Sequence, residues 1–475
     1  MKQTVLDRAQ KKAFRRLMPF VALLFVVNQL DRINISVAGP NGMNDELGLT
    51  AAQFGLASGL FFVGYMTLEV PSNLALHRFG ARRWLARIVV TWGIVATALT
   101  FVPNAEWLYG LRILLGMAEA GFAPGIVVYL TYWFTREMRS RATAFFLLGI
   151  PVAAAFGVPF MTLIGVQMDG FLGLDGWRVI LLITGLLAVL LGVMCWFYLT
   201  DRPADAQWLT AEESQVLTEA LANETPEKAG NHSIRKALLN GQVWLLAVAP
   251  FLVLYSMFVV TFFLPTLLKD INARESLGLS SVQVGLLSAI PWAIGGAGML
   301  FFASRSDKKR EVTKHFVVAT TIGSIGFFFV AMFGLDNPYI ALAALTVAMV
   351  GVLGSLTTFW VLPSRLYTGA AAAGVIALIN AIANFGSFLG PYSFGVLSDA
   401  TGGYRGGLII VAVAMLLAGL LIALRFRDLG RAPNAERVGS VSRTTDDVPE
   451  PLVHQAKYPI TAEGTPRQVF PREDD

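Results

Sequence analysis

Four ionisable residues lie inside two of the most apolar stretches of the sequence. Asp31 and Arg32 are neighbours in one stretch, and Arg112 and Glu119 belong to another. Charged groups in such surroundings are costly and usually have a function. The planar fork of arginine binds a carboxylate through two hydrogen bonds, and a buried carboxyl group can bind and release a proton. These residue types together indicate a site for an organic anion and a proton.

Helical spacing decides which of these side chains can meet. Arg112 and Glu119 are seven residues apart, about 20° short of two turns, and therefore share one helix face. Asp31 and Arg32 are adjacent, so their side chains diverge by about 100° and should pair poorly. Arg32 and Arg112 can bind an anion, or an ion pair within either helix can brace the fold. Both interpretations remain open from the sequence.

The composition identifies the surroundings of these residues. Of the 475 residues, 55% are hydrophobic and only 15% are charged, against about 25% charged residues in soluble proteins. Too little polar surface remains to cover a water-soluble body of this size. One cysteine, Cys195, and four dispersed histidines give no basis for a disulfide framework or a metal cluster. The sequence therefore predicts a protein that crosses a membrane several times.

Twelve stretches are long and apolar enough to be membrane-spanning helices, which need about 20 residues. Lysine and arginine gather in every second connection, whereas the connections 39–52 and 103–106 contain neither. Such residues mark the cytoplasmic side, so we expect both termini and the loop 201–241 in the cytoplasm and the spans in the cell (inner) membrane. The predicted spans are 17–38, 53–76, 84–102, 107–133, 142–166, 178–200, 242–268, 282–303, 315–334, 338–363, 372–397 and 405–425.

These spans give a depth for each charge. Arg32 lies six residues before the outer end of its span, and Arg112 lies five residues after the outer start of its own. At 1.5 Å per residue, both arginines lie about 8–9 Å deep and Glu119 about 18 Å deep. A carboxyl group in this interior binds a proton more readily, and a nearby arginine opposes this. An anion arriving at the arginine would weaken that opposition and so link proton uptake to anion binding.

Two features recur along the chain at nearly the same offset. The basic turns around His77 and Asp307 are 230 residues apart, and Pro159 and Pro391 in later spans are 232 residues apart. Internal symmetry of this kind is typical of secondary transporters, which bind substrate between two halves at mid-membrane. We predict a six-helix half at 1–200, a linker at 201–241, a second half at 242–426 and a disordered tail at 427–475.

Four segments resemble a known family over roughly residues 10–430: NQLDRINISVAGP, GYMTLEVPSNLALHRFGARRWLAR, RILLGMAEAGFAPG and YTGAAAAGVIALINAIANFGSFLGPY. They are similar to the anion:cation symporter family of the major facilitator superfamily, and most of all to bacterial tartrate, phthalate and related organic-acid permeases. The resemblance implies an all-α fold of twelve helices in two pseudo-symmetric halves. His77, in the basic turn after the second predicted span, differs from the superfamily, which usually has Asp at this position. Asp307, in the corresponding turn of the second half, matches the superfamily.

The resemblance also implies roles for individual residues. The positions of Asp31 and Glu119 match the protonated acids of the family, and the spacing after Arg112 resembles a motif tied to proton coupling. Tyr65 matches a substrate-contacting tyrosine of related sugar-acid transporters. The spans that carry Arg32 and Arg112 are implied to line a central cavity.

Further polar residues in the spans are candidates for substrate binding. Asn28 lies four residues before Arg32 and so on its face. Asn380 and Asn384 share a face by the same spacing, although asparagines also join helices without binding anything. A polar and aromatic patch contains Thr358 and Trp360. By contrast, we interpret Phe61 as a packing or lipid-facing residue and Glu69 as a structural or gating residue.

Together these features favour a proton-coupled symporter that imports a small organic anion such as a hydroxy-, sugar- or aromatic carboxylate. An exchanger or exporter with the same fold is the alternative. An enzyme would need clustered nucleophiles or metal ligands, and a channel would need a polar ring; neither pattern is visible. The sequence contains no GxxxxGK[ST] motif, so it does not indicate transport driven by ATP. We expect no cofactor beyond the coupling proton, no nucleic-acid partner, and a monomer surrounded by lipid.

Overall fold

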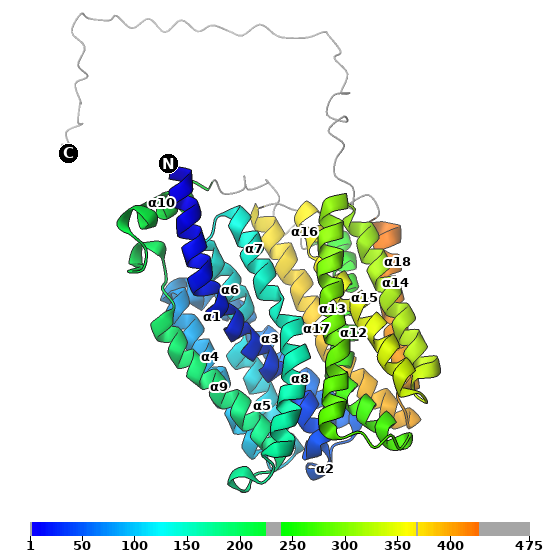
Figure 1. Cartoon of the computed structure of the whole chain (residues 1–475). Helices are drawn as coiled ribbons and strands as arrows, with labels where there is room; N and C mark the ends of the chain where they lie inside the picture. The colour runs from blue at the N-terminus through cyan, green and yellow to red at the C-terminus, as the bar shows by residue number, and fades with distance from the viewer. Residues whose placement is uncertain (1, 225–238, 367–368, 427–475) are drawn as a thin grey trace, which may run out of the picture. The chain divides into compact units, whose positions relative to one another are not determined.

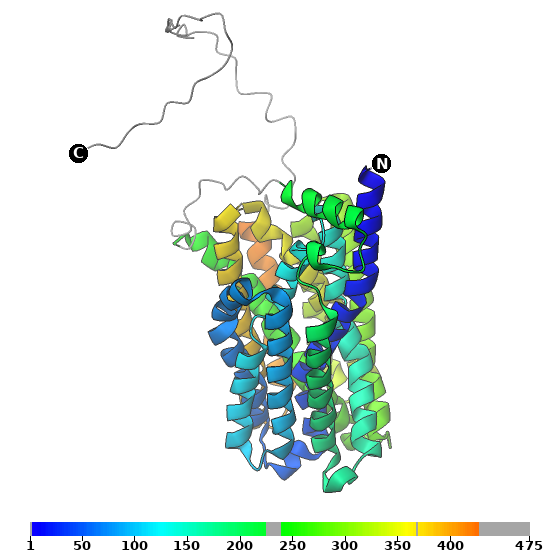
Figure 2. The same cartoon turned by 90° about the vertical axis from the view of Figure 1, so that its left-hand side faces the viewer.

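The computed structural model describes residues 2–224, 239–366 and 369–426, and this part of the chain forms helices and turns with no strand. Twelve of its helical runs are long and apolar enough to cross a membrane. This confirms the predicted number of spans and the all-α fold class. The spans run side by side (Figures 1 and 2). The tail predicted to be disordered lies outside the described residues.

The helices before residue 225 are α1 (Lys2–Ala38), η1 (Gly39–Met43), α2 (Asn44–Glu46), α3 (Ala51–Phe79), α4 (Ala81–Ala98), η2 (Leu99–Phe101), α5 (Ala105–Glu119), α6 (Phe122–Thr131), α7 (Arg136–Leu147), α8 (Gly149–Gln167), η3 (Phe171–Gly173), α9 (Gly176–Tyr198), η4 (Pro203–Asp205) and α10 (Ala211–Ala222). Those after residue 238 are α12 (Gly241–Arg274), α13 (Ser281–Lys309), α14 (Val312–Phe329), η5 (Val330–Gly334), α15 (Pro338–Phe359), α16 (Val361–Leu366), α17 (Gly369–Thr401) and α18 (Arg405–Arg425).

The helix of the first span begins at Lys2, earlier than predicted, and ends at Ala38, as predicted. The chain continues past Ala38 through the bent turn η1 into α2, which ends at Glu46. Gly42 makes the bend in η1 possible, because its φ of +119° is open only to glycine without strain. Arg32 therefore lies six residues before the end of α1, as the sequence predicted.

The second spans of the two predicted halves begin in the same way. Thr50 caps α3 in a reciprocal box with Gln53, and Ser280 caps α13 in the same box with Gln283. Each box satisfies two backbone N–H groups that have no partner within the helix. The two caps are 230 residues apart, which is the offset of the basic turns.

Close glycine contacts set the spacing of the helices around α3. A Cβ atom on Gly116 of α5 would lie 1.9 Å from the carbonyl oxygen of Phe61, and one on Gly64 would lie 2.0 Å from that of Ile113. On the other side of α3, a Cβ on Gly55 would lie 2.2 Å from the carbonyl oxygen of Pro391 in α17. Small residues allow such approach in membrane helices, and here they place α3 between α5 and α17.

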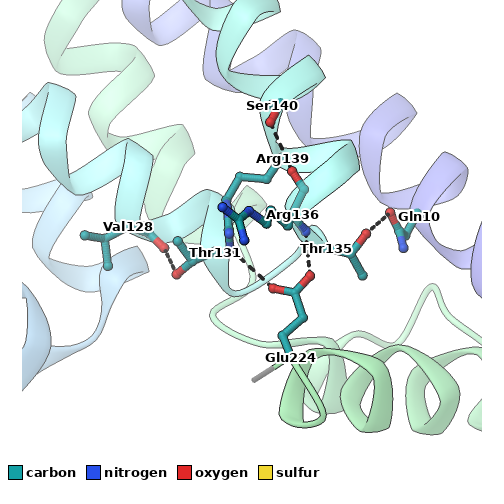
Figure 3. A network of polar contacts seen from close by, with 8 residues as sticks. All are labelled: Gln10, Val128, Thr131, Thr135, Arg136, Arg139, Ser140 and Glu224. Carbon is teal, nitrogen blue, oxygen red and sulfur yellow. Dashed lines mark hydrogen bonds and ion pairs between the residues drawn. The ribbon is translucent and has the colours of Figure 1, made fainter. Parts of the chain in front are cut away.

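The described part of the predicted linker contains a helix that the sequence analysis did not predict. Thr210 and Glu213 form a capping box at the start of α10, and the buried Glu213 carboxylate accepts a 2.8 Å hydrogen bond from Lys12 of α1. Beyond α10, the carboxylate of Glu224 accepts a hydrogen bond from the backbone N–H of Arg136, at the start of α7, and lies 3.8 Å from the guanidinium of Arg139 (Figure 3). These contacts attach this segment to α1 and α7.

Candidate functional site

The centre of the site is an ion pair between α1 and α5. Arg32 Nε donates a 2.5 Å hydrogen bond to Glu119 Oε1, and the Arg32 Nη2 atom lies against the same oxygen. Glu119 is fully buried, and the Arg32 side chain is 15% exposed. Glu119 therefore pairs with an arginine of another helix and not with Arg112 of its own.

The pairing joins two residues that the sequence analysis placed at different depths. Arg32 and Arg112 were expected at one level with Glu119 deeper, whereas the Arg32 side chain meets the Glu119 carboxylate directly. The long arginine side chain can span such a difference in depth, which an estimate from backbone positions does not include.

Phe61 and Tyr65 of α3 cover the two arginines. The centre of the Phe61 ring is 5.2 Å from the guanidinium carbon of Arg32 and 5.2 Å from that of Arg112. The Tyr65 ring centre is 5.0 Å from the guanidinium carbon of Arg32. Such contacts stabilise a desolvated guanidinium by about 2 kcal/mol. Tyr65 thus lies beside Arg32. Phe61, interpreted from the sequence as a packing or lipid-facing residue, is fully buried beside both arginines.

Arg112 is fully buried and holds α5 to α3. Its Nε donates a 3.1 Å hydrogen bond to the carbonyl oxygen of Ala57, and its Nη2 donates a 3.3 Å bond to that of Ser58. No carboxylate of the described residues forms an ion pair with it, and its Nη1 has no hydrogen-bond partner there. Arg112 therefore braces two helices and keeps one N–H group unused.

Asp31 faces away from Arg32, as the divergence of adjacent residues predicted. One carboxylate oxygen accepts a 2.8 Å hydrogen bond from the indole N–H of Trp92 in α4, and the other lies 3.5 Å from the Asn34 amide nitrogen. The Asn34 amide also donates to the Thr184 hydroxyl in α9. Asp31 is fully buried and has no ion pair within the part of the chain that the structure describes.

Several buried polar atoms beside the ion pair lack partners. Asn28 lies within reach of Glu119, but its amide atoms and the Glu119 Oε2 atom make no hydrogen bond of good geometry among the described residues. Together with Arg112 Nη1, these atoms belong to the two helices, α1 and α5, that carry the Arg32–Glu119 pair. Buried polar groups are almost always satisfied by protein or water, so this cluster indicates a place for a polar ligand or for water.

The predicted residues of the second half are only partly brought to this site. The Asn380 amide in α17 donates a 2.9 Å hydrogen bond to Glu69, which follows Tyr65 by one turn of α3. Asn384 is half-buried one turn further along α17. The Thr358 hydroxyl donates to carbonyl oxygens of its own helix, and Trp360 contacts the Phe359 ring. No contact joins these two residues to the arginines within the described residues.

Two residues at the site escaped the sequence analysis. Phe61 and Trp92 are apolar or aromatic residues in apolar spans, and their importance comes from contacts with other helices. A usable signal exists for Phe61, since it lies four residues before Tyr65 and thus on its face. Trp92 carries no such signal, because its partner Asp31 is 61 residues away.

Comparisons with known proteins agree with this architecture. The family model described as Major Facilitator Superfamily matches residues 21–391. A protein of Agrobacterium vitis named "Putative tartrate transporter" is 40% identical over 87% of this chain and 94% of its own length. A protein of Acinetobacter baumannii named "Quinolone resistance transporter" is 34% identical over 88% of this chain and 94% of its own length.

The fold is similar to that of a solved transporter. A crystal structure of a bacterial homologue of the human lysosomal transporter Spinster, in an inward-facing and unoccupied conformation, gives a TM-score of 0.72 at 17% identity. The match covers 90% of this chain and 99% of that chain. With twelve spans, a buried polar site between them and a family match over most of its length, the chain belongs to the Major Facilitator Superfamily and is a multi-pass membrane transporter, not an enzyme.

Proposed function

We propose that this protein imports a small organic anion together with a proton. The observation that carries the proposal is the buried Arg32–Glu119 pair, together with polar atoms of Asn28, Glu119 and Arg112 on the same two helices that lack partners among the described residues. An arginine beside two aromatic rings presents the planar guanidinium that binds a carboxylate through two hydrogen bonds. Glu119, which pairs with the same arginine, provides a carboxylate that can bind the proton.

The Arg32–Glu119 pair suggests how binding of the anion is coupled to binding of the proton. Arg32 forms its strongest pair with one carboxylate at a time, so an incoming anion competes with Glu119 for it. Glu119 is fully buried, and a buried carboxylate without a cation is too costly to persist. It therefore takes up a proton when the anion takes the arginine. Anion and proton then cross together, and both leave when the pair re-forms.

Two arginines favour an anion with more than one polar group. Arg32 would bind one carboxylate, and the free N–H of Arg112 and the Asn28 amide would bind a second carboxylate or a hydroxyl group. Tyr65, Asn380, Asn384, Thr358 and Trp360 remain candidates for the rest of the substrate. The name of the Agrobacterium vitis relative, which specifies tartrate, fits a hydroxylated acid of this kind.

The orientation that we propose follows the distribution of lysine and arginine. Both termini and the segment 201–241 face the cytoplasm, and the spans lie in the inner membrane. A C-terminal fusion to a reporter that is active in the cytoplasm should therefore be active. A C-terminal fusion to a reporter that is active only outside the cytoplasm should be inactive, and its activity would contradict this topology.

An exporter or exchanger with the same fold is the second candidate. The observation in its favour is the Acinetobacter baumannii relative, whose name specifies resistance. Proteoliposomes with labelled tartrate separate the candidates. Symport predicts accumulation driven by an acidic exterior and abolished by a protonophore, with sodium absent. Exchange would be favoured if accumulation of labelled tartrate does not depend on the proton gradient but requires unlabelled tartrate inside the proteoliposomes.

A further inference from the structure

A cavity of about 260 Å³ lies between α13 and α14, apart from the Arg32–Glu119 site. Arg305 and Lys309 of α13 and Lys314 of α14 line one part of it. Phe301, Val318 and Ile322 line the rest. The cavity surface is therefore almost entirely apolar, and the basic side chains contribute mainly their aliphatic parts to it.

The order of these residues along the two helices gives the cavity a direction. Phe301, Arg305 and Lys309 are spaced four apart on one face of α13, with the charges toward the helix end. Val318 and Ile322 follow Lys314 along α14 at the same spacing, again with the charge at the end. The basic part thus lies where both spans end, and the apolar part extends toward the middle of the membrane.

Of the three basic residues in the cavity lining, Lys314 has an acidic partner within the lining, whereas Arg305 and Lys309 have none among the described residues. The acidic residue in its lining, Glu311, forms a 3.6 Å ion pair with Lys314. The Nδ1 atom of His315 forms a hydrogen bond with the backbone carbonyl oxygen of Glu311. Among the described residues, no carboxylate forms an ion pair with Arg305 or Lys309, and both side chains are exposed.

We propose that this cavity binds an anionic phospholipid. The phosphate lies between Arg305 and Lys309, and an acyl chain follows Phe301 and Val318, which are 57% and 44% exposed. A soluble anion would gain nothing from these apolar walls, whereas a phospholipid matches both parts. Since the spans alternate, the turn after α13 lies at the same end as the start of α1 (Figure 1). In the proposed topology this is the cytoplasmic leaflet, where basic segments meet anionic lipids.

The test uses the full-length protein in phosphatidylcholine nanodiscs that contain phosphatidylglycerol with a photoreactive acyl chain. After illumination, labelled peptides are identified by mass spectrometry. We expect labelling on Phe301, Val318 or their neighbours, and much less with photoreactive phosphatidylcholine. Arg305→Gln with Lys309→Gln should weaken phosphatidylglycerol binding on the order of 30-fold, since each charge near an anionic lipid is worth about fivefold in affinity.

A matched control removes the same charges from the same turn. Lys308→Gln with Arg310→Gln also deletes one lysine and one arginine, but neither residue lines the cavity, so labelling should persist. The double variant Arg305→Lys with Lys309→Arg keeps both positive charges and should also retain labelling. Together with the charge-removing variant, it distinguishes loss of charge from misfolding as the cause of lost labelling. Equal labelling by phosphatidylcholine, an equal loss in both double variants, or displacement of the label by millimolar inorganic phosphate would overturn the proposal.

Discussion

Arg32 is the residue on which two interpretations of the site diverge. If it binds the anion, Arg32→Ala should reduce affinity at least a hundredfold, because a buried carboxylate left without its cation costs about 3–5 kcal/mol. Arg32→Lys should recover part of the affinity, since the charge returns without the fork. Arg8→Ala, an exposed change on the same helix, is the control. The measurement is tartrate-dependent stabilisation of the purified protein.

A double variant separates binding from bracing. Arg32→Ala strands the buried Glu119 carboxylate, whereas Arg32→Ala with Glu119→Gln removes both charges and should regain melting temperature. Anion binding should stay lost in the double variant. If binding returns with stability, or if Arg32→Ala binds tartrate normally, Arg32 is only a brace.

At the scale of elements, the spacing of α3 and α5 decides whether Phe61 can lie beside both arginines. Gly116→Ala would place a Cβ 1.9 Å from the backbone carbonyl of Phe61, and a backbone atom cannot move aside as a side chain can. We expect a loss of about 1–3 kcal/mol in stability and weaker anion binding. Gly110→Ala, on the same helix with nothing within 4 Å of the new Cβ, should be neutral or slightly stabilising. Melting curves of the two variants in detergent test this; equal curves would refute the close packing.

The attachment of α10 to α1 should depend on pH. Burial raises the pKa of Glu213, but the hydrogen bonds from Lys12 and the Thr210 backbone outweigh this and hold it below its usual value. The contact is therefore complete above the ordinary glutamate pKa and is lost as the pH falls through the lower folded value. Since Lys12 is 43% exposed, its contribution is about 1 kcal/mol or less.

Tryptophan fluorescence reports this attachment, because Trp208 stacks on Trp133 with ring centres 5.2 Å apart. We expect the signal to change as the pH is lowered from 6 to 3. Glu213→Gln retains the capping box, which accepts Gln, but removes the charge, so its signal should not follow this titration. A variant that titrates like the wild type would assign the transition to another group.

Long-range contacts mark the limit of what the sequence predicts. The spans and the divergence of Asp31 from Arg32 follow from composition and helical geometry, and both are confirmed. The Arg32–Glu119 contact was not predicted, because the depths were taken from backbone positions and did not include the length of the arginine side chain. The partners of Asp31 and Glu119 lie 61 and 87 residues away, and packing selects them.

At the scale of the whole molecule, hydrogen bonds join the start of α3 to the end of α17 at one end of the bundle. The Asp399 carboxylate at the end of α17 accepts hydrogen bonds from the backbone N–H groups of Ala51 and Ala52 at the start of α3, at 3.1 and 2.9 Å. A carboxylate at a helix N-terminus is favourable by about 0.3–1 kcal/mol at an exposed site. Lys269 of α12 adds a hydrogen bond to the carbonyl oxygen of Pro40.

Weakening these hydrogen bonds should open that end more often. Asp399→Ala should increase maleimide labelling of a cysteine at Thr162, a buried residue that lines the cavity between α8, α12 and α13. Replacing Cys195 by alanine removes the background. Glu106→Ala, an exposed acidic change, is the control. Unchanged labelling after Asp399→Ala would show that these hydrogen bonds do not hold the end closed.

The central claim is that Glu119 releases and binds the coupling proton when Arg32 changes partner. Glu119→Gln mimics the protonated acid permanently and cannot release a proton. In proteoliposomes the variant should therefore exchange labelled for unlabelled tartrate, because exchange moves no net proton. It should fail to accumulate tartrate under a pH gradient, because the empty carrier cannot restore the Arg32–Glu119 pair. Glu106→Gln, at an exposed position on the same helix, should do both. Normal gradient-driven accumulation by Glu119→Gln would contradict the account and leave Asp31 as the proton carrier.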